Sequence, residues 1–351
     1  MKMKQNIILL LLILGITSCK KDPKPEPVAP DFKNGVLCMN EGLFQQNNAS
    51  LSYYSIDSSK TTSNIFASIN GRGLGDTAND MISYIYMGKP YIAIAVDVSS
   101  QVEILDGLTL KSVKQIPIFN GTSAREPRSL QFYDDYLYSI NFDGTVSKID
   151  LSNFTITNNF NCGLNPESAV INNGFIYVVN SGGLNSPTYD STISVIKLTN
   201  GSTSVFETAI NCSSIKKDAD NELYVISRGN YGSIPSKLLR ISSITNSTIE
   251  TFNINITTMD YYNNALYYYD SSDNGIHVLN TQTETISNSI LIDCSGFQNL
   301  YKIQIDTVNQ LIYLIDANGY VNSATVKCYG LNGTFKYEFT SGLNTGKLLF
   351  L

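Results

Sequence analysis

The chain has 351 residues, of which 42% are hydrophobic and 15% are charged, and its formal net charge is −6 at pH 7. This composition supplies a large apolar core and is not that of a disordered chain. The acidic balance, with no basic run in the folded part, argues against nucleic acid as a partner.

The first 18 residues have the layout of a secretory signal peptide. Lys2 and Lys4 precede an apolar run at residues 7–16 that is too short to span a bilayer, and "ITSC" ends it. "ITSC" resembles a bacterial lipobox, which predicts that Cys19 becomes the first residue and is lipidated. The alternative is an ordinary signal peptide followed by an incidental cysteine.

Residues 19–34 are predicted to be the lipidated cysteine and a tether. The stretch "KKDPKPEPVAPDF" alternates proline with charge, and such a segment favours an extended spacer over a packed structure. We therefore expect a membrane-anchored protein whose folded domain covers residues 35–351.

The domain contains a repeated phrase. "NCGLNPESAVINNGFIYVVNSGG" at residues 161–183 is followed by "NCSSIKKDADNELYVISRG" at residues 211–229, and each has an apolar stretch, a two-residue turn signal and a second apolar stretch. The second stretches begin at Leu37, Tyr91, Leu137, Ile176, Leu223, Leu266 and Ile312, mostly 39–47 residues apart. About four strands fit each period, which predicts an all-β, seven-bladed β-propeller.

The two chain ends are predicted to share one blade. Residues 36–40 already read as a second strand, with further strand patterns to residue 68, whereas "TGKLLFL" at 345–351 is an apolar strand left after the seventh blade. Pairing of these ends would close the ring and remove its open edges. No helix is expected anywhere in the domain, and "GRGLG" at 71–75 is expected to connect two strands.

One face of the ring is predicted to carry the function, because its loops differ most in length. The loops at 41–49, 181–191 and 228–236 follow second strands, and those at 70–80 and 120–129 lead into inner strands. Their aromatic, amide and charged side chains suit recognition, although Gly, Asn and Tyr are also ordinary loop formers. The candidate ligand-binding residues are Glu41, Phe44, Gln45, Arg72, Asp76, Arg125, Glu126, Tyr189, Arg228, Asn230, Tyr231 and Tyr320.

Catalytic patterns are sparse, so we expect no enzyme, no cofactor and no metal site. His277 is the one histidine and falls in a third-strand pattern on the outer part of blade six. Two carboxylate pairs, Asp76 with Asp80 and Glu126 with Glu167, could take part in acid-base chemistry or bind calcium. Asp80 is better interpreted as a cap for backbone amides. Five cysteines besides Cys19 are expected to be structural thiols, with one disulfide as the alternative.

Several segments resemble the YncE-like seven-bladed propeller lipoproteins of Bacteroidota. They are "MNEGLFQQNNASLSYYSID", "NGRGLGDTANDM", "VVNSGG", "YDSTISVI" and "ISRGNYGSIPSKLLRI", and the resemblance extends from Gly35 to the C-terminus. It implies a surface lipoprotein that captures cobalamin and passes it to a TonB-dependent outer-membrane transporter. Surface members usually have acidic residues after the lipidated cysteine, whereas this chain has Lys20, Lys21 and Asp22, so a periplasmic location stays open.

Two classes of function remain at this point. A capture module for a bulky nutrient such as a corrinoid predicts a concave loop face with convergent aromatic and amide groups. A protein-binding or glycan-binding scaffold is the alternative, and a protein-binding face would be flatter and more apolar.

Overall fold

The computed structural model describes residues 32–351. The signal peptide at 1–18, the lipidation site Cys19 and the tether as far as residue 31 lie outside the described residues. The first described strand is β1 (Gly35–Asn40).

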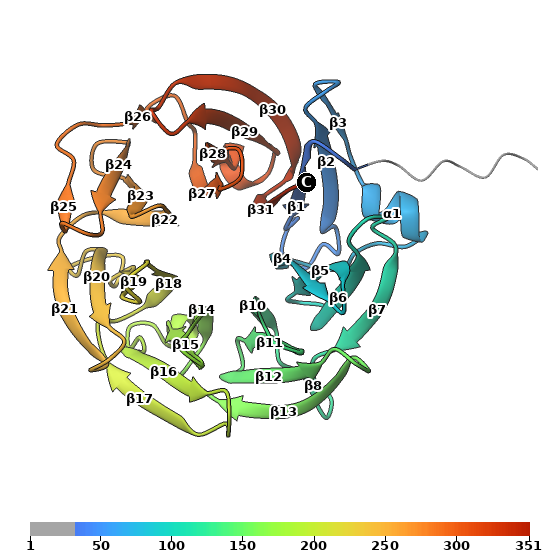
Figure 1. Cartoon of the computed structure of the whole chain (residues 1–351), viewed down its shortest axis with the longest axis horizontal. Coiled ribbons are helices and arrows are strands. Elements are labelled where there is room, and N and C mark those ends of the chain that lie inside the picture. Colours follow the sequence, from blue (N-terminus) through green and yellow to red (C-terminus); the bar gives the residue numbers. More distant parts are fainter. Residues whose placement is uncertain (1–31) are drawn as a thin grey trace, which may run out of the picture. The chain divides into compact units, whose positions relative to one another are not determined.

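Seven antiparallel sheets, six of four strands and one of five, are arranged in a ring around a central channel (Figure 1). Residues 32–351 therefore form a seven-bladed β-propeller, as the sequence predicted. All seven marker residues, from Leu37 to Ile312, lie in the second strands. From the channel outward, blade 2 has β4 (Ala78–Tyr86), β5 (Lys89–Val96), β6 (Gln101–Asp106) and β7 (Ser112–Pro117).

The other complete blades follow the same order. Blade 3 has β10 (Pro127–Tyr133), β11 (Tyr136–Asn141), β12 (Thr145–Asp150) and β13 (Thr155–Asn161), and blade 4 has β14 (Pro166–Asn172), β15 (Phe175–Asn180), β16 (Thr192–Lys197) and β17 (Thr203–Glu207). Blade 5 has β18 (Cys212–Lys217), β19 (Leu223–Ser227), β20 (Lys237–Ser242) and β21 (Ser247–Phe252). Blade 6 has β22 (Ile256–Tyr262), β23 (Ala265–Asp270), β24 (Gly275–Asn280) and β25 (Thr285–Ile286), with β26 (Ile292–Asp293) also on β24, and blade 7 has β27 (Leu300–Asp306), β28 (Leu311–Asp316), β29 (Ser323–Gly330) and β30 (Phe335–Leu343).

Blade 1 is built from both ends of the described chain. The last strand, β31 (Thr345–Phe350), is its inner strand and pairs antiparallel with β1, which is followed outward by β2 (Ser50–Ser55) and β3 (Lys60–Thr62). Leu348 of β31 is 1% exposed, so this strand contributes to the core as well as to the ladder. The predicted closure is confirmed.

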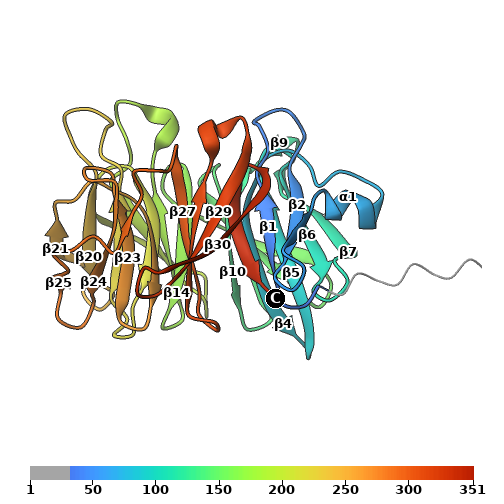
Figure 2. The same ribbon diagram turned by 90° about the horizontal axis from the view of Figure 1, so that it is seen from above.

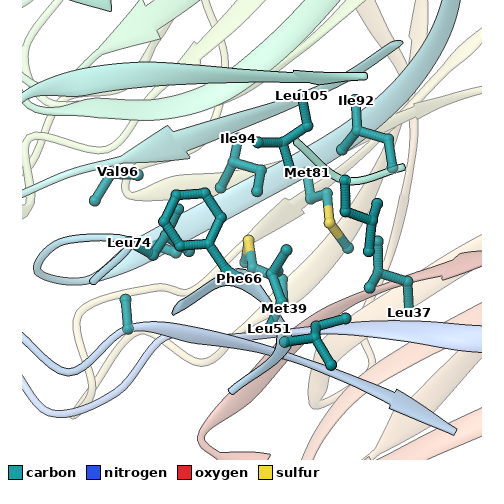
Figure 3. Close-up of a cluster of buried hydrophobic side chains, with 14 of the residues drawn as sticks. Leu37, Met39, Leu51, Phe66, Leu74, Met81, Ile92, Ile94, Val96 and Leu105 are labelled. Atoms are coloured by element: carbon teal, nitrogen blue, oxygen red, sulfur yellow. The ribbon is translucent and has the colours of Figure 1, made fainter. Parts of the chain in front are cut away.

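The core consists of seven apolar clusters, one between each pair of neighbouring blades. Figure 3 shows the cluster between blades 1 and 2, where Met39 and Leu51 meet Met81 and Ile94. Phe66 is also buried in this cluster. Burial on both faces of every blade explains why the second strands are continuous apolar runs rather than alternating ones.

The absence of helices was a wrong prediction. Residues Ile65–Asn70 form a short helix, α1, where a further strand of blade 1 was expected, because Ile65 and Phe66 insert into the cluster between blades 1 and 2. The "GRGLG" segment therefore joins a helix to β4 rather than two strands. Two 3₁₀ turns, η1 (Gly183–Asn185) and η2 (Asn318–Tyr320), lie in loops. No helix among residues 32–351 has the length and apolarity to cross a membrane.

Figure 2 shows the ring from its edge, with the long loops rising on one face, here called the loop face. The loops between β1 and β2 and between β28 and β29 belong to the adjacent blades 1 and 7. Those between β15 and β16 and between β19 and β20 belong to the adjacent blades 4 and 5. A short β8–β9 hairpin (Phe119–Asn120, Ser123–Ala124) lies in the loop that leads into blade 3.

Candidate functional site

Each inner strand carries a β-bulge close to the loop face. The register between inner and second strand shifts once in every blade, for example between Ala78 and Asp80 in blade 2, which leaves one inner-strand residue without a partner. These seven residues, called the bulge ring, are Asn79, Arg128, Glu167, Ser213, Thr257, Tyr301 and Gly346. All seven line the central channel. A bulge redirects a side chain, and an equivalent bulge in each of the seven blades places one residue at the same opening.

A second ring lies beside the first. The residue that follows each second strand donates its backbone N–H, at 2.8–3.1 Å, to a carbonyl in the segment leading into the inner strand of its blade. This set, called the strand-end ring, is Glu41, Asp97, Phe142, Ser181, Arg228, Ser271 and Ala317. The repeated hydrogen bond holds the backbone of these seven residues at the same position relative to the bulge ring in each blade.

Polar contacts join the two rings across neighbouring blades. Arg128 forms an ion pair with Asp97 at 3.3 Å, and Arg228 forms one with Glu167, also at 3.3 Å. The Tyr301 hydroxyl donates to Glu41 at 2.8 Å. A Cβ atom at Gly346 would collide with the Glu41 carboxylate, so the glycine leaves the room that this side chain occupies.

The channel inside these rings encloses a cavity of about 560 Å³. Deeper in it, Lys216 pairs with Asp260 at 2.6 Å and Lys347 pairs with Asp80 at 3.0 Å. Asp80 also accepts the backbone N–H groups of Met81 and Leu130, each at 2.9 Å, so it caps amides as expected. The cavity volume lies within the range of about 300–1,000 Å³ that is common for small-molecule sites.

Burial changes the acidity of several groups around the opening. It raises the pKa of Asp97 to about 6, against the opposing effect of Arg128, and it raises the pKa of Glu41, against Lys302 and the Tyr301 hydroxyl. Burial also lowers the pKa of Lys302, although Glu41 works in the other direction. The opening is therefore partly desolvated, and electrostatic interactions with a charged ligand are stronger there than in bulk water.

Aromatic side chains stand at the rim of the channel on two sides. Tyr189 and Tyr231, from the long loops of blades 4 and 5, meet edge to face with ring centroids 6.3 Å apart. Tyr301 and Tyr320 of blade 7 do the same at 5.7 Å. Beside Tyr231, a second hollow of about 420 Å³ extends toward blade 6, and Arg228 lines both hollows.

Seven of the twelve predicted residues line the channel, lie beside residues that line it, or are exposed on the loop face. Glu41 and Arg228 line the channel. Tyr320 contacts the channel residue Tyr301, and Tyr231 lines the second hollow beside Arg228 and contacts Tyr189. Phe44, which is 67% exposed, and Gln45, which is also exposed, lie in the loop between β1 and β2.

The other five hold the loops in place instead. Arg72 is directed to the outer strands of blade 2, where it pairs with the buried Glu103 at 2.8 Å. Arg125 is buried and pairs with Asp143 at 2.8 Å in the turn after β11. Asp76 accepts the backbone N–H groups of Gln45 and Asn47, each at 3.0 Å.

Asn230 and Glu126 also serve the local backbone. The Asn230 side chain accepts the N–H groups of Gly232 and Ile234 at 3.0 and 2.8 Å and so shapes its own loop. Glu126 has a positive φ of 58°, and its N–H donates to Ser100. Of the two carboxylate pairs considered for chemistry, Asp76 is committed to loop amides and Glu167 to Arg228. Within residues 32–351, no group of three His, Cys, Asp or Glu side chains is placed to hold a metal ion.

Other expectations about single residues have clear outcomes. His277 lies in β24, the third strand of blade 6, as expected, and contacts Asp273 at 2.9 Å. Cys38, Cys162, Cys212, Cys294 and Cys328 are free thiols in the structure. Burial raises the pKa of Cys162, Cys212 and Cys294 to about 12, which makes them unreactive at neutral pH.

The sequence reasoning missed most of the bulge ring, although the repeat contains its signal. The seven inner strands can be aligned on one buried apolar residue, as in "ANDM", "PRSL", "PESA", "CSSI", "ITTM", "LYKI" and "TGKL". The second letter of each segment is the bulge residue. Aligning inner strands, rather than second strands, would have placed Arg128, Glu167 and Tyr301 at one level of the channel.

The comparisons with known proteins bear on the fold. No protein-family model matches the sequence, and no curated protein matches it. Among solved structures, the chain is similar to a quinonprotein alcohol dehydrogenase-like protein from Bacteroides thetaiotaomicron VPI-5482, with a TM-score of 0.63 and 16% identity over 92% of this chain and 79% of the other.

Two further structures illustrate how widely the fold is used. Hydrazine synthase from Kuenenia stuttgartiensis gives a TM-score of 0.59 at 15% identity, covering 73% of this chain and 85% of the other. The computationally designed Ika8 protein gives 0.58 at 11% identity, covering 89% and 95%. An enzyme and a designed protein share this architecture. The function must therefore be argued from the site.

Proposed function

We propose that this protein is a non-enzymatic ligand-capture propeller of the cell envelope, with cobalamin or a related corrinoid as its ligand. The observation that carries the proposal is the concave, polar opening on the loop face, framed by the bulge ring, by Glu41 and Arg228 of the strand-end ring, and by the tyrosine pairs of blades 4 and 5 and of blade 7. A flat apolar face would suit a protein-binding scaffold, and this opening is neither flat nor mainly apolar.

The channel itself is too small for a whole corrinoid, so the macrocycle would lie across the rim. Tyr231 is 71% exposed and already meets Tyr189, which offers an apolar edge for a broad ring. Arg228 lies between the channel and the second hollow and can donate to the amide side chains of a corrinoid. The remaining parts of the proposal, a lipid anchor at Cys19 in the outer membrane and transfer to a TonB-dependent transporter, are supported by the lipobox and the family resemblance.

Isothermal titration calorimetry with cyanocobalamin tests the ligand. Wild-type protein is expected to bind, and Tyr231→Ala or Arg228→Ala to weaken binding by about 1 to 3 kcal/mol, the range of an anchor residue at an interface. Tyr133→Ala is the matched control, because Tyr133 is 43% exposed at the end of β10, beside the turn to β11 on the opposite face.

Stability separates loss of contact from loss of structure. Tyr231→Ala should melt like the wild type, whereas Arg228→Ala leaves Glu167 without its cation and should melt somewhat lower. No heat with cyanocobalamin at micromolar protein eliminates the corrinoid. Binding that both variants leave intact moves the site away from this rim.

A further inference from the structure

One cation inside the channel, Lys302, forms no ion pair within residues 32–351, although the nearby Glu41 carboxylate favours its charged form. Lys302 lies on β27 next to the bulge residue Tyr301 and lines the cavity, and its ammonium group makes no ion pair or hydrogen bond with any residue of the 32–351 segment. The ammonium lies over the ring of Tyr301, with 4.6 Å from Nζ to the ring centroid. The neighbouring cations Lys216, Lys347 and Arg228 are all paired.

An ammonium group that forms no ion pair in a partly desolvated cavity can attract an anionic ligand. Burial makes the bare charge costly, and an anionic ligand at hydrogen-bond distance would offset that cost. The charge of the ligand is limited by Glu41 and Glu167, which line the same cavity. A singly charged carboxylate matches Lys302, which forms no ion pair within residues 32–351, whereas a phosphate monoester with a charge of about −1.5 to −2 would be repelled by these carboxylates.

Free hydroxyl groups face the same space from other blades. Ser168 of β14, Ser213 and Ser214 of β18 and Thr257 of β22 line the cavity, and their side chains make no hydrogen bond within the described part of the chain. They can donate to and accept from the hydroxyls of a ligand. We propose that the central channel binds a hydroxylated monocarboxylate, such as a sugar acid, with its carboxylate on Lys302 and its hydroxyls toward blades 4 to 6.

Calorimetry with D-glucuronate tests this site, with D-glucose as the neutral ligand of nearly the same shape. Wild-type protein is expected to bind glucuronate at least about tenfold more tightly than glucose. Lys302→Met should lose at least about tenfold of the glucuronate affinity, since a charged hydrogen bond is removed. Lys114→Met, at an exposed position of the outer strand β7, is the matched control and should bind as the wild type does.

Glu41→Gln gives a prediction of opposite sign. Removing this negative charge near Lys302 should raise the ratio of glucuronate affinity to glucose affinity. This variant is the test that remains if Lys302→Met does not fold. Equal binding of the two sugars, no binding of glucuronate at millimolar concentration, or undiminished binding by Lys302→Met overturns the proposal. Tighter binding of glucose 6-phosphate than of glucuronate overturns the choice of a monocarboxylate. The cyanocobalamin titration uses neither variant, so the two proposals fail separately.

Discussion

Removal of residues 345–351 should unfold the propeller rather than shorten one blade. Leu348 is 1% exposed, and deleting a buried leucine side chain costs about 2 to 5 kcal/mol. Lys347 is the cation of Asp80, and leaving a buried carboxylate without its partner costs about 3 to 5 kcal/mol more. The sum, roughly 5 to 10 kcal/mol, is comparable with the whole stability of a typical domain, about 5 to 15 kcal/mol.

The assay is thermal unfolding by circular dichroism together with size-exclusion chromatography. The truncated protein should lack a cooperative transition and should aggregate, because β1 then presents an open edge. Leu348→Ala should melt clearly below the wild type. The control Val113→Ala, at a 44% exposed position of β7, should melt at the same temperature as the wild type. A truncated protein that melts within a few degrees of the wild type would refute the closure argument.

Two further predictions concern the anchor and the opening. Cys19→Ala should shift the protein from the detergent phase to the aqueous phase or leave it unprocessed, and unchanged partitioning would contradict lipidation. Asp97 has a pKa raised to about 6, so its contribution to the free energy of unfolding falls as the pH rises from about 4 to about 6. Urea unfolding should show the wild type losing on the order of 3 kcal/mol relative to Asp97→Asn across that window, and parallel pH curves would show that Asp97 is not perturbed.

The ring could be predicted because its signal is local and repeated. Each second strand is a short apolar run followed by a turn, and such runs mark blades without any knowledge of long-range contacts. Helix α1 could not be predicted in this way, since its two buried residues pack against strands of both neighbouring blades. Six residues are too few for a recognisable helical period.

The site was harder to predict because it depends on pairing register and on distant partners. A bulge is a property of the ladder, and residues as different as Gly346 and Tyr301 occupy the same bulge position. Arg72 looked like a surface group, yet its partner Glu103 is a buried residue of β6, 31 positions away. Arg228 and Glu41 lie at the channel because both directly follow a second strand, and the strand order alone predicts that position.

The central claim, that the loop face captures a small molecule, is tested most directly on protein purified from its own cells. Mass spectrometry and visible absorbance of the small molecules released on denaturation should reveal a corrinoid in near-stoichiometric amount, and Tyr231→Ala protein should carry much less of it. Release of no small molecule, together with a protein partner that stays bound through purification, would contradict the claim and favour a protein-binding scaffold.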